Sequence, residues 1–250
     1  EGSVSPLTKG MIDAIRILNK YGFEFHSGLE IEEDFYNFQA LNIPKHHPAR
    51  QMQDTFYLEG KTQDEMNYLL RTHTTCVDIR AILSKGLKPP FGITSCGKVF
   101  RVESDKTHSP MFHQVDAIMV ERDINMGNLK FLLQQFLNEF FEVDNIEIRF
   151  RPSFFPFTEP SAEIDIGYKE INGKIVIGGS ENFLEVGGCG MIHPNVLDAV
   201  NIDKDEFQAI AFGMGLDRLI MLKYGITDVR QITANNLQWI NHYSFDSCVL

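Results

Sequence analysis

The chain has 250 residues, of which 43% are hydrophobic and 23% charged, a composition that excludes disordered, collagen-like and coiled-coil proteins. No linker interrupts it, so we expect one globular domain over residues 1–250. Lys and Arg total 23 against 34 Asp and Glu, and the net charge of −11 excludes a free-standing nucleic-acid binder unless a partner or a local basic patch supplies positive charge. The scattered cysteines and the lack of a long apolar run predict a cytoplasmic protein without membrane contact.

The first third of the chain predicts helices separated by extended segments. Apolar residues at helical spacing indicate an amphipathic helix that begins near Leu7 and ends at Tyr21-Gly22. A short helix over residues 31–41 should follow, with extended chain before Pro48. Further predicted elements are a strand over residues 54–58 and a helix over residues 74–85.

The middle of the chain predicts a hairpin of two strands, residues 98–103 and 111–121, joined by a polar loop. Because side chains alternate along a strand, Phe112, Gln114 and Asp116 share one face of the second strand, and the opposite face is apolar. The apolar face should pack on helices. We therefore expect the polar face to point toward a cleft.

After the hairpin, Asn125 can cap a helix with a wide apolar stripe that continues to Phe141. A final helix is predicted over residues 216–224. The remaining predicted strands span residues 146–151, 162–168, 175–177, 183–186 and 210–213. Successive strands with short turns, and helices grouped elsewhere, favour an α+β fold with a mainly antiparallel sheet flanked by helices.

The sequence lacks the glycine-rich loops that usually bind nucleotide phosphates, so arginines would have to hold any phosphate. Arginines stand out at three places: Arg101, the pair Arg149 and Arg151, and Arg218. A guanidinium binds phosphate oxygens in a bidentate manner and keeps its charge when desolvated. The alternative for each arginine alone is an ordinary surface ion pair with a neighbouring carboxylate.

Several spaced blocks together resemble the catalytic domain of the α subunit of bacterial phenylalanyl-tRNA synthetase, a class II aminoacyl-tRNA synthetase. The blocks are His47-Pro-Ala-Arg50, Leu70-Arg-Thr-His73, Phe100-Arg101, Phe112-His-Gln114, Phe155-Pro-Phe157-Thr-Glu159, Gly188-Cys-Gly-Met191 and Gly213-Met-Gly-Leu-Asp217-Arg218. The resemblance places motif 1 at about residues 30–50, motif 2 at about 97–121 and motif 3 at about 209–224. It also implies that the family's N-terminal tRNA-binding arm is absent.

The resemblance implies roles for residues on the ATP side of the site. Arg101 is expected at the α-phosphate and Arg218 at the γ-phosphate, which makes them the two catalytic residues. Glu103 and His108 are expected near ATP, and Phe112 is expected to stack on adenine. Glu159 matches the family's magnesium ligand, so ATP and Mg²⁺ are the implied co-substrate and ion.

The resemblance also implies an amino-acid site. The positions that hold the ammonium and carboxylate are His73, Thr75, Gln114 and Asp116. The walls of the ring pocket are Phe155, Phe157 and Ala211. Thr75 stands where the family commonly has Ser, and Asp116 where it commonly has Glu, so a water could separate the shorter Asp116 side chain from the ammonium.

The function implied is ATP-dependent activation of L-phenylalanine and its transfer to tRNA(Phe), with the synthetase β subunit as partner in an α₂β₂ assembly. One alternative is a non-catalytic binding or regulatory module that kept the synthetase fold. The other is a metal-dependent hydrolase that uses Glu159, Glu163 and Asp165. Loss of the arginines would favour the first alternative, and hydrolysis without an amino acid would favour the second.

Overall fold

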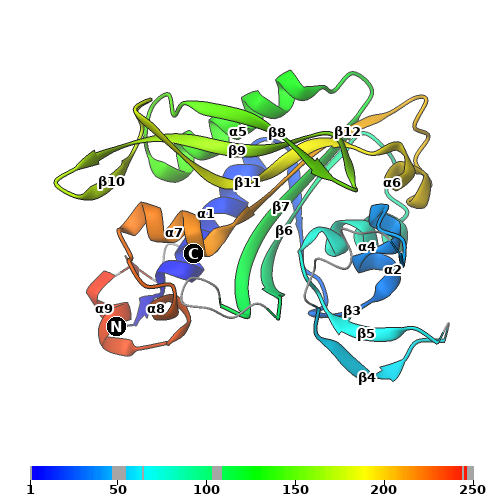
Figure 1. Cartoon of the computed structure of the whole chain (residues 1–250), viewed down its shortest axis with the longest axis horizontal. Coiled ribbons are helices and arrows are strands. Elements are labelled where there is room, and N and C mark those ends of the chain that lie inside the picture. Colours follow the sequence, from blue (N-terminus) through cyan, green and yellow to red (C-terminus); the bar gives the residue numbers. More distant parts are fainter. Residues whose placement is uncertain (1, 47–54, 64, 103–108, 244, 247–250) are drawn as a thin grey trace.

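The computed structural model describes residues 2–46, 55–63, 65–102, 109–243 and 245–246. An eight-stranded sheet occupies its centre, in the order β10-β9-β11-β12-β7-β6-β2, with β8 paired to β9 (Figure 1). All pairs are antiparallel except β2 with β6, which confirms the predicted α+β class. The strands are β2 (Phe23–His26), β6 (Phe91–Phe100), β7 (Met111–Glu121), β8 (Ile148–Phe155), β9 (Thr158–Ile171), β10 (Lys174–Ile177), β11 (Asn182–Ile192) and β12 (Gln208–Gly215).

Two smaller sheets lie beside the large one. A three-stranded sheet is formed by β3 (Ile31–Glu33), β5 (Asn67–Leu70) and β4 (Tyr57–Lys61). A short antiparallel pair joins β1 (Ser3–Val4) to β13 (Phe245–Asp246), so the two ends of the described chain meet. Figure 1 shows the three-stranded sheet next to α2 and α4, away from the β1 end of the molecule.

Helices cover both faces of the large sheet. They are α1 (Pro6–Lys20), α2 (Asp34–Asn37), the 3-10 helix η1 (Gln39–Leu41), α4 (Thr75–Lys85), α5 (Met126–Phe141), α6 (Pro194–Ala199), α7 (Leu216–Tyr224), α8 (Arg230–Thr233) and α9 (Leu237–Tyr243). One apolar core packs α1, α5 and α7 against the face that carries Val115 and Phe212. A second core packs α4, η1 and α6 against the opposite face, at Ile118 and Val120.

The second core covers only part of its face, and this leaves space for a site. Phe112, Gln114 and Asp116 share the face of β7 that carries Ile118 and Val120, because side chains alternate. Ile118 and Val120 are buried under helices, whereas Phe112 and Gln114 are half-buried. The predicted strand over residues 111–121 and its polar face are therefore confirmed.

The predicted helix over residues 31–41 is wrong at its start. Residues Ile31–Glu33 form β3, which pairs with β5, and the short helices α2 and η1 follow. Glu32 is buried and accepts hydrogen bonds from Arg80 on α4 at 2.9 and 2.6 Å, while Ile31 is exposed. A long-range ion pair therefore turns the polar residue inward, which local periodicity does not reveal.

Other predicted element boundaries also differ from those in the structure. The strand predicted to begin at residue 98 begins at Phe91, because β6 is an inner strand whose glycines and small polar residues pack between β2 and β7. The strand over residues 54–58 is found at Tyr57–Lys61, and the glycine-rich stretch 187–190 belongs to β11. The helix over residues 216–224 coincides with α7, but α8 and α9 follow it.

The cap of α5 gives a stability test of the predicted helix start. The Asn125 side chain accepts hydrogen bonds from the backbone N–H groups of Gly127 and Asn128, and the Asn128 side chain accepts one from the Asn125 N–H. We predict that Asn125→Ala lowers the free energy of unfolding in urea by about 1 kcal/mol. Asn125→Asp should retain the cap, and Lys130→Ala on the exposed side of α5 should change little. A loss equal in Asn125→Ala and Lys130→Ala would contradict the capping role.

Candidate functional site

Small residues on β11 and β12 form the floor of the candidate site. Gly188 and Gly190 lie opposite Gly213 and Ala211 in the ladder, so their positions share one face. A Cβ on Gly188 would come 2.8 Å from the Phe155 ring, and one on Gly190 would come 2.7 Å from the Thr158 Cβ. Larger side chains would therefore displace the groups that stand above the floor.

Asp116 is the buried centre of this face, with 4% of its surface exposed. Its Oδ2 accepts hydrogen bonds from the hydroxyls of Thr74, at 2.5 Å, and Thr75, at 3.0 Å. A Cβ on Gly213 would lie 2.2 Å from the Asp116 Oδ1, so glycine at this position makes room for the carboxylate. The start of α4 and the two strands β7 and β12 are thus joined through one carboxyl group.

Burial raises the pKa of Asp116 to about 6, because the ionised form loses its hydration. The hydrogen bonds from Thr74 and Thr75 and the charges of Arg71 and Arg101 lower the pKa in part. Arg71 is itself buried and donates from Nε to the Lys98 carbonyl oxygen at 2.7 Å. Asp116 is therefore ionised at neutral pH but poorly solvated, which is the state that attracts a cation.

His73 and Gln114 complete the polar part of the face. The Thr74 N–H donates to the Gln114 Oε1 at 3.2 Å, so Gln114 is tied to the segment that precedes α4. Burial, and then the charge of Arg101, lower the pKa of His73 to about 3, so its ring is neutral. Its Nε2 is buried and has no hydrogen-bond partner among the described residues. That atom is available to a polar ligand.

Aromatic rings stand next to these polar groups. Phe155 and Phe157 stack with their centroids 5.8 Å apart and their planes 9° apart, and His73 lies edge-on to Phe157 at 6.4 Å. Phe155 ends β8, Thr158 begins β9, and Phe157 lies in the turn between them. The two rings therefore lie side by side although the backbone turns between their residues. Ala211 and Phe157 both pack against the second core, and Ala211 lies opposite Gly190 in the β11–β12 ladder.

Arg101 and Arg218 are connected through contacts that involve neighbouring residues of β7. The Arg101 guanidinium carbon is 5.1 Å from the Phe112 ring centroid, and Nε donates to the Thr72 carbonyl oxygen at 3.2 Å. The next residue along β7, His113, donates its backbone N–H to Asp217 at the start of α7, and its Nδ1 lies 3.2 Å from the Asp217 Oδ1. Asp217 directly precedes Arg218. The fold therefore brings Arg101 and Arg218 to the same end of β7.

Arg149 and Arg151 form ordinary surface ion pairs, which was the alternative expected for a single arginine. Arg149 and Arg151 both donate to Asp165, and Arg151 also contacts Glu163. These arginines lower the pKa of Asp165. In contrast, Arg218 is exposed, and within the described part of the chain no ion pair involves it.

Glu159 stands at the edge of the site. Its carboxylate is 77% exposed and lies 3.5 Å from the His193 Nε2. No group of three or more potential metal ligands occurs within the described ranges. Of the remaining predicted site residues, Glu103 and His108 lie outside the described residues, as does the part of motif 1 around Pro48.

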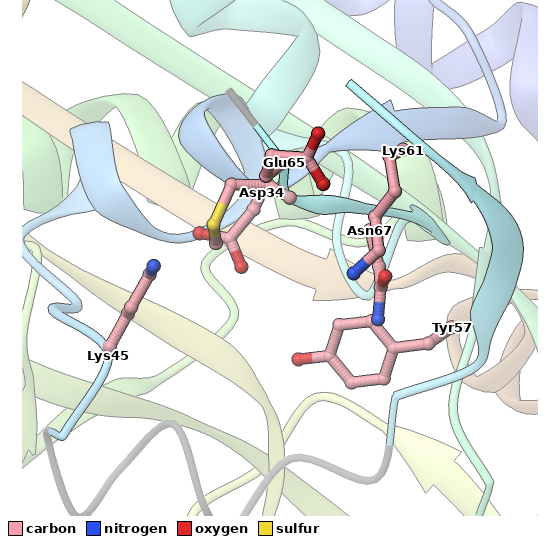
Figure 2. Close-up of a pocket in the computed structure, with 7 residues that line it drawn as sticks. Asp34, Lys45, Tyr57, Lys61, Glu65 and Asn67 are labelled. Atoms are coloured by element: carbon pink, nitrogen blue, oxygen red, sulfur yellow. The ribbon is translucent and has the colours of Figure 1, made fainter. Parts of the chain in front are cut away.

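A separate pocket of about 300 Å³ lies at the three-stranded sheet and contains none of the predicted site residues. Figure 2 shows Lys45 and Tyr57 on opposite sides of it. Its lining residues are Asp34, Lys45, Tyr57, Lys61, Glu65, Met66 and Asn67. Their mixed charges favour no single ligand class, so the site of interest is the face around Asp116.

Comparison with known proteins shows the family of the chain. The model of the tRNA synthetases class II core domain (F) matches residues 1–243. The alpha subunit of phenylalanine–tRNA ligase from Rickettsia bellii is 50% identical over 99% of this chain and 67% of its own length. The corresponding subunit from Rhodospirillum rubrum is 48% identical over 98% of this chain and 67% of its own length.

The chain belongs to the phenylalanyl-tRNA synthetase alpha-subunit family of class II tRNA synthetases. The crystal structure of pyrrolysyl-tRNA synthetase from Desulfitobacterium hafniense has the same fold, with a TM-score of 0.65 and 18% identity over 93% of this chain and 74% of that one. No helix in the described ranges has the length and apolar character that a membrane crossing needs.

Sequence reasoning missed three residues of this synthetase site. Thr74 and Arg71 precede α4 and support Asp116, and Asp78 is a buried acid within α4. The signal for Asp78 is a charged residue within a predicted helix that is otherwise largely apolar. Thr74 and Arg71 had no such signal, because their partners are more than 25 residues away along the chain.

The raised pKa of Asp116 predicts a pH-dependent stability. Between about pH 4 and pH 7 the folded chain keeps a proton that the unfolded chain releases, so this residue lowers the free energy of unfolding as the pH rises. The difference between the pKa of about 6 in the folded chain and the ordinary pKa of an aspartate corresponds to about 3 kcal/mol. Asp116→Asn should remove this dependence. The difference between the free energies of unfolding of the variant and of the unsubstituted chain should therefore rise by about 3 kcal/mol from about pH 4 to pH 7. A difference that stays constant over this range would show that burial does not raise the pKa of Asp116.

Proposed function

We propose that this chain activates L-phenylalanine with ATP and transfers it to tRNA(Phe). The observation that carries the proposal is the arrangement on one sheet face: a buried, cation-attracting carboxylate, Asp116, beside the stacked rings of Phe155 and Phe157. An α-amino acid with a benzyl side chain presents the complementary ammonium and ring. The phenylalanine–tRNA ligase alpha subunits, about half identical to this chain, support the same substrate.

In the first step the substrate carboxylate attacks the α-phosphate of ATP and expels pyrophosphate, so phenylalanyl-adenylate forms. Arg101 would hold the α-phosphate, where negative charge develops, and Arg218 would bind the departing phosphates. Phe112, which lies beneath the Arg101 guanidinium, offers a face on which adenine can stack. The enzyme contributes position and charge, and none of its side chains becomes covalently modified.

The acidic residues fit a magnesium ion that is held mainly by ATP. Mg²⁺ in nucleotide sites uses one or two protein carboxylates together with phosphate oxygens and water. The exposed carboxylate of Glu159 matches that requirement. When bound, Mg²⁺ supplies positive charge to the phosphate oxygens.

The amino-acid side of the site would select the substrate by both of its ends. Asp116 would attract the ammonium, and the neutral His73 ring, with Thr75 and Gln114, would orient the polar groups of the amino acid. Phe155, Phe157 and Ala211 would surround the phenyl ring. A phenol hydroxyl buried among them would lose its hydrogen bonds to water, although an apolar pocket rejects an added hydroxyl only weakly.

In the second step a terminal ribose hydroxyl of tRNA attacks the mixed anhydride and releases AMP. A chain with a net charge of −11 needs help to hold RNA. We propose a β subunit as partner in an α₂β₂ assembly, and a cytoplasmic location, where the free thiols Cys76, Cys96 and Cys189 stay reduced. The hydrolase alternative is not favoured, because arginines already engage Glu163 and Asp165.

The arginines can be tested by phenylalanine-dependent exchange of pyrophosphate into ATP. Arg101→Ala and Arg218→Ala should each reduce this exchange at least 100-fold, since each removes a charge that the transition state requires. Arg230→Ala is the matched control, because Arg230 is exposed and pairs locally with Asp228. Circular dichroism should show all three variants folded. Full exchange in a folded Arg101→Ala or Arg218→Ala variant would refute the assigned role, and exchange driven by another amino acid would refute the substrate.

The floor of the ring pocket gives a second test. Ala211→Gly removes a methyl group from a proposed wall of the ring pocket, opposite Gly190, so it should admit para-chlorophenylalanine and raise kcat/KM for that substrate at least tenfold relative to L-phenylalanine. Ala209→Gly makes the same change two residues earlier on the same face of β12 and should leave the ratio unchanged. An unaltered ratio in Ala211→Gly would place the ring elsewhere.

A further inference from the structure

Asp78 is a buried carboxyl group that the proposed mechanism does not use. It lies in α4, three residues after Thr75, and only 1% of its surface is exposed. Neither of its carboxylate oxygens has a hydrogen-bond partner among the described residues. Because an unpartnered ionised carboxylate in an apolar interior is very unfavourable, this group must hold a proton or face a cation.

The surroundings of Asp78 place it behind the amino-acid site. Its neighbours are Asp116 on β7 and Ser95 on β6, and these two residues are directly opposite each other in the β6–β7 ladder. The Ser95 hydroxyl donates to the Thr74 carbonyl oxygen at 3.2 Å. Thr74 and Thr75 in turn donate to Asp116. The two carboxyl groups therefore share one small, tightly hydrogen-bonded region.

Burial, and then the negative charge of Asp116, raise the pKa of Asp78 well above its usual value. Asp116 accepts two hydroxyl hydrogen bonds that stabilise its charge, whereas neither oxygen of Asp78 has a partner among the described residues, so Asp78 is the member of the pair that holds a proton. Other groups in this region are Cys76 on α4, Cys96 on β6, and Arg71, His73 and Arg101.

The elements that pack against α4 carry further charged groups, among them the buried Asp34 at the start of α2. Glu32 pairs with Arg80, and the His26 Nε2 lies 3.3 Å from the Glu24 carboxylate on β2. On β7, His113 contacts Asp217. Asp116 is therefore the charged group that raises the pKa of Asp78.

We propose that the buried Asp78–Asp116 pair couples amino-acid binding to proton release, because the substrate ammonium replaces the proton on Asp78 as the positive charge that neutralises the pair. This inference rests on the proposed function and adds Asp78 to the amino-acid site as a positioning residue. A cation next to Asp116 favours the ionised form of its neighbour, so Asp78 passes its proton to the buffer. The paired negative charges then hold the ammonium more firmly than Asp116 alone.

The proposal fixes the direction of the pH dependence. Below the upper pKa of the pair, binding must displace a proton, so the KM for L-phenylalanine should fall by up to tenfold for each unit of pH increase. Above that pKa the KM should level off. With Asp78→Asn the pair has no second proton to lose, so the KM should be nearly constant above pH 7, while kcat changes little.

The direct test is isothermal titration calorimetry of L-phenylalanine into the full-length α chain assembled with its β subunit, at pH 7 in two buffers of different ionisation enthalpy. The unsubstituted protein should release close to one proton for each phenylalanine bound. Asp78→Asn should release about one tenth of that, because Asp116 is then almost fully ionised. Asp205→Asn, the same change at an exposed position, should match the unsubstituted protein.

An infrared difference spectrum of the unsubstituted protein gives a readout that needs no variant. Phenylalanine should remove the absorption band of a protonated carboxylic acid. Binding without proton release or band loss would overturn the inference while leaving the proposed function intact, and so would equal release by Asp78→Asn. Absence of phenylalanine binding would overturn both.

Discussion

An ionised carboxylate inside a protein is stable only if its surroundings replace the water it has lost. Asp116 meets this requirement through two threonine hydroxyls at the start of α4 and through the space that Gly213 leaves on β12. The central hairpin, the neighbouring strand and the helix on the open face of the sheet must therefore keep their relative positions for this one group to remain buried. The same constraint sets the position of the carboxylate that we propose as the ammonium site.

The rest of the site is arranged around that point by the ladders of the sheet. The β11–β12 register places small residues beneath Phe155 and Thr158, and the β7–β12 register places Gly213 beneath Asp116. At the far end of β7, the contact of His113 with Asp217 fixes the start of α7, from which Arg218 extends. The polar groups, the aromatic rings and Arg101 thus lie on one face of a few adjacent strands, and α7, which packs on the other face, brings Arg218 to the same end of β7.

The sequence predicted the parts of this arrangement that depend on local periodicity. The strand over residues 111–121, its polar face and the apolar stripe of α5 were all found as expected, because alternation and helical spacing report directly on burial. The inward turn of Glu32 and the inner strand that begins at Phe91 were missed. The first depends on Arg80, 48 residues away, and the second on neighbours at both of its edges. Asp78 was missed although it is a charged residue within a largely apolar helix, because its burial depends on how α4 packs on the sheet. The roles of all the predicted site residues remain predictions, and Glu103 and His108 also lie outside the described residues.

A structure of the full-length assembly with a non-hydrolysable phenylalanyl-adenylate analogue would test the central claim most directly. We expect the analogue's ammonium next to Asp116, its phenyl ring against Phe155 and Phe157, and its phosphate in contact with Arg101, with Arg218 facing the space that pyrophosphate leaves. An analogue bound away from β7, or an Arg218 side chain that opens onto a different surface from Arg101, would contradict the account.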